Sequence, residues 1–202
     1  MSPPKRPRRA RRDFFGEGHF RAFLEACEAL SKAWLRDFAE FGVLTGMRPG
    51  EIRQLRRNAV TLRAGIVHEN AEYGLIQLAA GETKTGEART VLLVPAAREI
   101  LDRQPVSMRH PNLYFLGHHG RPITKGSLRH HFNEARKRAG LAVARPHMTR
   151  HTAASWMVQR GVPLPFIKEI LGHRDIRTTE GYAHMLPQHL APAMAALAQR
   201  AV

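Results

Sequence analysis

Two short stretches of the sequence combine residue types that can bind an anion. In Thr45-Gly-Met-Arg-Pro-Gly-Glu-Ile52, Arg48 stands beside the predicted start of a helix, and Glu51 follows three residues later on the same face. In His147-Met-Thr-Arg-His, the side chains of His147 and Arg150 face one side if the segment is helical, so both can donate hydrogen bonds to an anion. Each stretch alone is compatible with a solvated or helix-capping residue.

A third stretch carries a candidate nucleophile. Leu171-Gly-His173 is followed nine residues later by Tyr182, which lies within Thr179-Glu-Gly-Tyr-Ala-His184. A lone tyrosine is usually a core residue or an amphipathic surface residue. A phenol has a pKa of about 10, so Tyr182 would need an adjacent base or nearby cations in order to attack as a phenolate.

These stretches resemble the tyrosine recombinase or phage integrase family. That family is marked by a Thr-Gly-x-Arg-x-x-Glu box, a lysine in a β-hairpin turn, a His-x-x-Arg box, a Leu-Gly-His box and a tyrosine soon after it. The matching residues, in the order of the family, are Arg48, Lys84, His147, Arg150, His173 and Tyr182. The resemblance covers roughly residues 18–186. Five boxes in order with suitable gaps are far more specific than any one of them.

The resemblance implies that the chain cuts and rejoins DNA by transesterification, in which Tyr182 forms a 3′-phosphotyrosyl intermediate. Phosphodiester exchange builds negative charge on the non-bridging oxygens, so a catalyst needs fixed cations there. Arg48 and Arg150 suit this role, because a guanidinium is always charged and forks onto two phosphate oxygens. His147 and His173 can add hydrogen-bond donors or exchange a proton near neutral pH.

The leaving 5′-oxygen needs a proton, and Lys84 is the candidate general acid because it lies in the polar turn Gly81-Glu-Thr-Lys-Thr-Gly86. The residue pattern alone is equally compatible with an ordinary exposed turn lysine, and it is the family resemblance that favours a catalytic role. Glu51 is expected to orient Arg48 or to cap its own helix, since an acid facing the phosphate would oppose the charge being stabilised.

No metal and no cofactor is expected, because the arginines take the place of divalent ions in this scheme. The pairs His118-His119 and His130-His131 lack a second pair or a carboxylate cluster in metal-ligand spacing, so they are predicted to be solvated loop and helix positions. His151 is predicted to point away from His147 and to have a packing or supporting role.

The implied partner is double-stranded DNA, and the implied assembly is a homotetramer on two DNA sites, with a monomer as the state without DNA. A topoisomerase of type IB, a telomere-resolving enzyme and a non-catalytic DNA-binding regulator on the same fold remain alternatives. A pure binder would have no use for Tyr182, which argues against the regulator.

The composition agrees with a nucleic-acid partner. The net charge is +15 and the pI is about 11.3, which favours binding to polyanions. Cys27 is the only cysteine, so no internal disulfide can form, and a reducing compartment is the default. The sequence holds no apolar run of membrane-spanning length and no signal-peptide core. We therefore expect no membrane partner and a prokaryotic-type cytoplasmic protein associated with DNA.

A basic segment opens the chain. Residues 1–17 are predicted to be a flexible arm or the remnant of a linker, and residues 18–202 the catalytic domain. The helical DNA-clamping domain that normally precedes the catalytic domain in this family is expected to be absent here. The phosphate-binding candidates of the arm are Lys5, Arg6, Arg8, Arg9, Arg11 and Arg12. A nuclear localisation signal is the rival interpretation of such a run.

The elements that must position these residues are mostly helical. Apolar spacing and capping residues predict helices at roughly 20–30, 34–41, 49–55, 95–104, 125–138, 149–160 and 164–171, and another opening near Pro192. Three short stretches around 65–67, 74–78 and 89–94 are rich in β-branched residues and predict strands. The predicted class is α+β, mainly α-helical with one small three-stranded antiparallel sheet, the catalytic-domain fold of DNA breaking-rejoining enzymes. The stretch from Val60 to Lys84 is slightly long for that fold, which predicts a bulge or extension in the first hairpin.

Overall fold

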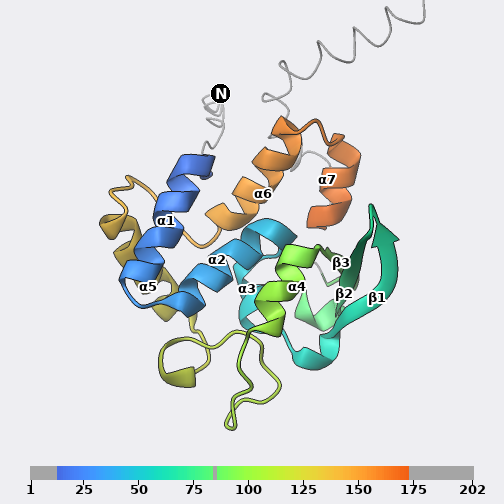
Figure 1. Cartoon of the computed structure of the whole chain (residues 1–202), viewed down its shortest axis with the longest axis horizontal. Coiled ribbons are helices and arrows are strands. Elements are labelled where there is room, and N and C mark those ends of the chain that lie inside the picture. The colour runs from blue at the N-terminus through green and yellow to red at the C-terminus, as the bar shows by residue number, and fades with distance from the viewer. Residues whose placement is uncertain (1–12, 84–85, 173–202) are drawn as a thin grey trace, which may run out of the picture.

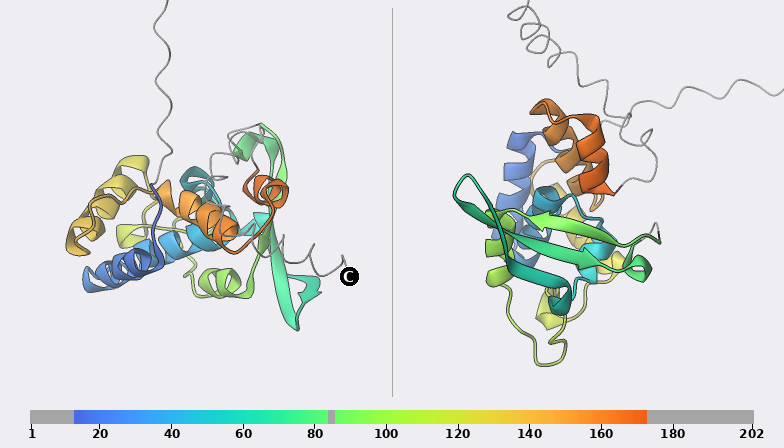
Figure 2. Two further views of the ribbon diagram at one scale, coloured as in Figure 1. Left: turned by 90° about the horizontal axis from the view of Figure 1, so that it is seen from above. Right: turned by 90° about the vertical axis from the view of Figure 1, so that its right-hand side faces the viewer.

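The computed structural model describes residues 13–83 and 86–172. Helices gather on one side of a three-stranded antiparallel sheet of order β1-β2-β3 (Figure 1). Viewed from the side of the sheet, the strands lie in front of the helices (Figure 2, right). The predicted α+β class is confirmed. The helices are α1 (Glu17–Ala29), α2 (Ala33–Thr45), α3 (Pro49–Arg53), α4 (Pro95–Asp102), α5 (Lys125–Arg138), α6 (Met148–Gln159) and α7 (Leu164–Leu171).

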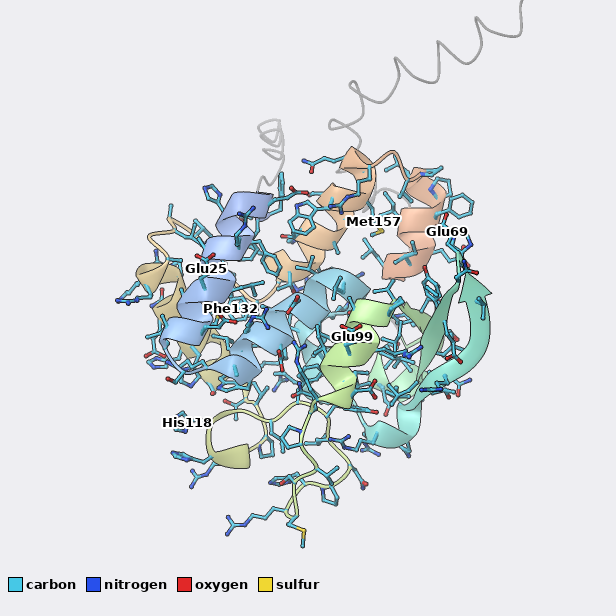
Figure 3. All side chains as sticks on the ribbon, viewed as in Figure 1. Glu25, Glu69, Glu99, His118, Phe132 and Met157 are labelled. Atoms are coloured by element: carbon cyan, nitrogen blue, oxygen red, sulfur yellow. The ribbon has the colours of Figure 1, made fainter. Side chains whose placement is uncertain are left out.

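Aromatic rings join the first helices into one core. The apolar stripe predicted from Phe20 to Leu30 does form the buried face of α1, and its Phe23 ring lies 4.9 Å from the ring of Phe132 on α5. Phe132 is labelled in Figure 3. Cys27 belongs to this face and is fully buried, and burial raises the pKa of its thiol to about 12. The thiol therefore stays protonated and serves as a small packing group.

The packed domain begins earlier than residue 18. Phe15, which the sequence analysis assigned to the arm, is 1% exposed and packs its ring against Phe20 and Phe23. Its backbone N–H donates to Thr152 Oγ1 on α6 at 2.9 Å, and its carbonyl accepts from Trp156 Nε1 at 3.1 Å. These contacts attach the segment before α1 to α6, so Phe15 is part of the fold.

The sheet consists of β1 (Val60–His68), β2 (Ala71–Leu78) and β3 (Arg89–Leu93). Its first hairpin has a register shift between Thr61 and Ile66, which agrees with the predicted bulge or extension. The hairpin turns at Glu69 and Asn70, both with positive φ, as a tight two-residue turn requires. Glu69 is labelled at the tip of this hairpin in Figure 3.

A second, smaller core joins α6 to α7. It contains Ala154, Val158, Ile167 and Leu171, with Met157 packed against them (Figure 3). This packing fixes the C-terminal end of α7 beside the body of the domain. Within the ranges given above, no helix is both long enough and apolar enough to cross a membrane.

Candidate active site

Arg150 connects the ends of two helices. Helix α2 ends at Gly46, whose left-handed φ of 62° turns the chain toward Arg48. The Gly46 carbonyl accepts a hydrogen bond from Arg150 Nη1 at 2.9 Å, and the Leu171 carbonyl accepts one from Arg150 Nη2 at 2.6 Å. Arg150 is only 4% exposed, so its guanidinium is held rigidly between α2 and α7.

Arg48 reaches the same end of α7. It precedes α3, which starts at Pro49 as predicted, and its Nη2 donates to the Gly172 carbonyl at 3.2 Å. Its Nη1 donates to Glu51 Oε1 at 2.9 Å, and its backbone N–H donates to Glu51 Oε2 at 2.8 Å. Glu51 thus both orients the Arg48 side chain and caps α3, the two roles that the sequence suggested as alternatives.

A third arginine, which the sequence analysis did not single out, completes this cluster. Arg89 is the first residue of β3, and its Nη2 donates to Glu51 Oε2 at 2.7 Å. Its Nη1 donates to the Ile170 carbonyl at 3.1 Å. The one signal in the sequence is an arginine that opens an otherwise apolar strand just after the lysine-bearing turn. That signal does not indicate which distant residue the arginine contacts.

The electrostatics of the cluster favour an anion. Arg48 and Arg89 pair with the single carboxylate of Glu51, and Arg150 adds a third positive charge at the neighbouring end of α7. Burial alone would raise the pKa of Glu51, but the Arg89 guanidinium and the hydrogen bonds from Arg48 outweigh burial and hold the pKa below its ordinary value. Glu51 is therefore ionised at neutral pH, and the cluster keeps a net positive charge.

His147 lies at the start of α6, three residues before Arg150, and is exposed. The prediction that His151 points away from it is wrong, because the two rings meet at 5.2 Å between centroids. Residues four apart on a helix share a face, which brings His151 beside His147.

The other three predicted residues fall outside the described ranges, and for two of them the structure describes the residue directly before. His173 directly follows Gly172, and Lys84 directly follows Thr83, whose hydroxyl lies 2.8 Å from the Glu87 carbonyl across the β2–β3 turn. Tyr182 and the six basic arm residues also lie outside the described residues. The structure thus brings together Arg48, Glu51 and Arg150.

A cationic cleft of about 840 Å³ lies between α3, the β2–β3 turn and the start of α5. Its basic lining residues are Arg53, Arg56 and Lys125, and Glu82 is its acid. The N-terminus of α5 opens into the cleft, where backbone N–H groups and the helix dipole favour negative charge. The cleft can accept a phosphate-bearing ligand.

One histidine pair, predicted to be solvated, has a carboxylate beside it. On α5, His131 Nδ1 lies 2.6 Å and His130 Nε2 lies 3.3 Å from the same oxygen of Glu134. His130 is exposed, but His131 is half-buried. These three side chains have metal-ligand types within 4.8 Å of one another. Lys32 Nζ, however, lies 3.0 Å from that same oxygen and already supplies a cation, so the cluster ties α5 to the α1–α2 turn.

Comparison with known proteins identifies the family. The sequence model of the phage integrase family matches residues 14–189, which is most of the chain. The chain belongs to the phage integrase family. The family resemblance inferred from the motif boxes is thereby confirmed.

Individual relatives agree. The chain is 29% identical over 147 residues to the tyrosine recombinase XerC of Lactobacillus delbrueckii subsp. bulgaricus, covering 72% of this chain and 48% of the relative. The chain therefore spans about half the length of this curated relative. Its fold matches the catalytic domain of bacteriophage HP1 integrase with a TM-score of 0.63 at 26% identity, covering 90% of this chain and 93% of that one.

A second solved structure adds a nucleic-acid complex. XerH recombinase bound to its palindromic difH substrate after cleavage matches with a TM-score of 0.66 at 25% identity, covering 90% of this chain and 52% of that one. The chain thus has the architecture of a tyrosine recombinase catalytic domain.

Proposed function

We propose that this chain is the strand-cleaving and rejoining domain of a site-specific DNA recombinase. The Tyr182 hydroxyl attacks a DNA phosphate, a 3′-phosphotyrosyl bond forms, and the bond to the 5′-oxygen breaks and leaves a 5′-hydroxyl. Attack by a 5′-hydroxyl on the phosphotyrosyl bond reverses this step and restores the phosphodiester. Because one phosphoester bond replaces another, no external energy source is required.

One observation carries the proposal: Arg48 and Arg150, the arginines of two separate motif boxes, both reach the end of α7 that leads into the Leu-Gly-His box. Arg150 and Arg48 donate to the carbonyls of two consecutive residues, Leu171 and Gly172, directly before His173. Two guanidiniums held on one helix end suit the non-bridging oxygens of a single phosphate. His147 and His173 are proposed to add donors to the same oxygens, and Lys84 to protonate the leaving 5′-oxygen.

The cationic cleft supports a DNA-facing surface on the side of the β2–β3 turn. Arg53, Arg56 and Lys125 are suited to contact backbone phosphates, which position a protein on DNA without specifying sequence. The active assembly is proposed to be a homotetramer on two duplex sites, working in the cytoplasm of a prokaryotic-type cell. The DNA complex of the structural relative XerH supports the duplex partner.

Strand transfer between two duplexes tests this function. The full chain is incubated with a labelled duplex and a longer unlabelled duplex, both carrying the sequences that flank the gene, in EDTA and without nucleotide. We expect a labelled strand of new length, because the cleaved strand is joined to the 5′-hydroxyl of the second duplex. Relaxation of a supercoiled plasmid without any exchanged strand would contradict recombination and would indicate a topoisomerase activity.

Deleting residues 1–12 should weaken DNA binding and flatten its dependence on salt, because the deletion removes six cations that are not balanced by acids. Each lost phosphate contact lowers the slope of log affinity against log salt by about 0.9. Fluorescence anisotropy across a salt series measures the slope. An identical slope in the truncated and full chains would show that the arm does not touch DNA.

A further inference from the structure

Arg89 is not one of the motif residues, yet it is built into the cluster that holds them. We infer that Arg89 is a positioning residue for DNA cleavage. It binds the Glu51 carboxylate and the end of α7. Glu51 can then orient Arg48, while the charge of Arg89 offsets that of Glu51 and Arg48 keeps its attraction for the phosphate. This inference rests on the proposed cleavage function.

The contacts of Glu51 show how Arg89 acts on Arg48. Both carboxylate oxygens are occupied: Oε1 accepts from the Arg48 side chain, while Oε2 accepts from the Arg48 backbone and from Arg89. Glu51 is 3% exposed and Arg89 is 11% exposed, so water screens this ion pair poorly. Arg89 is thus the second cation of a partly buried three-residue ion network.

The charge balance of this network gives Arg89 a role beyond stability. If Glu51 were paired with Arg48 alone, the buried pair would be neutral, and Arg48 would lose much of its attraction for a phosphate. Arg89 supplies the second positive charge, so the group of three carries a net charge of +1. A second cation that offsets the carboxylate orienting Arg48 therefore favours the binding of an anion at Arg48.

The second contact of Arg89 fixes the helix end that leads into His173. The last carbonyls of a helix lack partners within the helix, and cations are favourable there. At α7, the carbonyls of Ile170, Leu171 and Gly172 accept from Arg89, Arg150 and Arg48 in turn.

Gly172 allows the side chain of Arg89 to approach this closely. It has a φ of 63°, and a Cβ at this position would lie 2.7 Å from Arg89 Cδ. Arg89 therefore couples β3, and with it the turn that leads to Lys84, to the residues directly before His173.

The test compares single-turnover cleavage by the full chain and its variants, using a nicked suicide duplex made from the sequences that flank the gene. We expect Arg89→Met to slow formation of the covalent adduct about 10- to 100-fold at saturating protein, since a misplaced or neutralised catalytic group costs this much. The affinity for uncleaved DNA, measured by anisotropy, should change far less. Arg89→Lys keeps the positive charge but loses the forked guanidinium, so its cleavage rate should lie between those of the unmodified chain and Arg89→Met.

A charge-rescue variant separates positioning from simple stabilisation. In Arg89→Met, Glu51 is left to neutralise Arg48, so adding Glu51→Gln should speed cleavage relative to Arg89→Met alone, although it removes a further ion pair. The matched control is Arg98→Met. Arg98 is a partly buried arginine of α4 that donates to the Glu72 carbonyl at 2.7 Å and pairs with the Glu72 carboxylate at 3.6 Å. The Arg98→Met variant should have a lower melting temperature and an unchanged rate of cleavage.

Three results would overturn the inference. Cleavage by Arg89→Met at the unmodified rate would remove any role for Arg89, and a double variant no faster than Arg89→Met would reduce that role to stability. Absence of an adduct with the unmodified chain would refute the proposed function itself, and the inference with it. If Arg89→Met melts below the assay temperature, Arg89→Gln takes its place with the same expected rescue.

Discussion

Replacing Arg150 with alanine should slow DNA cleavage by at least about 100-fold, because the guanidinium is proposed to supply charge where the non-bridging oxygens become more negative in the transition state. Arg48→Ala should have a comparable effect for the same reason. The rate of adduct formation under single-turnover conditions measures both. Arg150→Lys is not expected to restore the rate, because an ammonium cannot bridge the Gly46 and Leu171 carbonyls as the guanidinium does.

Stability needs a control in this experiment, since Arg150 also holds α2 to α7. Arg160→Ala removes the same charge from a side chain that follows the same helix but is 61% exposed, and it should cleave at the unmodified rate. Each variant is assayed below its own melting temperature. Cleavage by Arg150→Ala or Arg48→Ala at the unmodified rate would show that these guanidiniums do not act on the phosphate.

Lys84→Ala should differ from the arginine variants in one respect. A DNA substrate whose leaving group is a 5′-thiol should restore its cleavage, because a thiolate departs without a proton. The same substrate should not restore cleavage by Arg48→Ala or Arg150→Ala, because these variants lack a positive charge at the phosphate and not a proton donor. Rescue of the arginine variants but not of Lys84→Ala would mean that the proposed roles are reversed.

The helical framework could be predicted because local rules decide it. The stripe of Phe20, Phe23 and Cys27 is buried as its spacing predicted, since each of these side chains packs wherever the helix meets its neighbours. Pro49 at the first turn of α3 and Gly172 at the end of α7 are equally local signals. The prediction that Arg48 and Arg150 share one site rested on the family resemblance, because nothing local links them.

Long-range ionic contacts could not be predicted in this way. Arg89 meets Glu51 and Ile170 only because β3 passes beside both α3 and the end of α7. Lys32 meets Glu134 by a similar long-range approach, between the α1–α2 turn and α5. Hydrophobic periodicity indicates which face of an element is buried, but it does not specify which charged side chains of distant elements will pair. The arginine that shares Glu51 with Arg48 was therefore missed.

Among the three tyrosines, the structure makes two unsuited to attack a phosphate. Tyr114 is 5% exposed with the Arg57 guanidinium 4.4 Å from its ring centre, and burial raises the pKa of its hydroxyl, which disfavours the phenolate. Tyr73 lies in β2 opposite Ile66, a position typical of sheet packing. Tyr182 is the remaining candidate and follows His173 at the spacing of the family.

Tyr182 is proposed to become joined to DNA through a 3′-phosphate, and a suicide substrate can trap this joined state. The duplex is nicked so that the released fragment diffuses away and the adduct cannot reverse. It carries the sequences that flank the gene. We predict a protein–DNA adduct in denaturing gels, mapped to Tyr182 by mass spectrometry of the digested complex. Tyr182→Phe should eliminate it while DNA affinity stays nearly unchanged, because the hydroxyl contributes to chemistry more than to binding. An adduct that persists in Tyr182→Phe, or one that maps to a 5′-phosphate, would contradict the account.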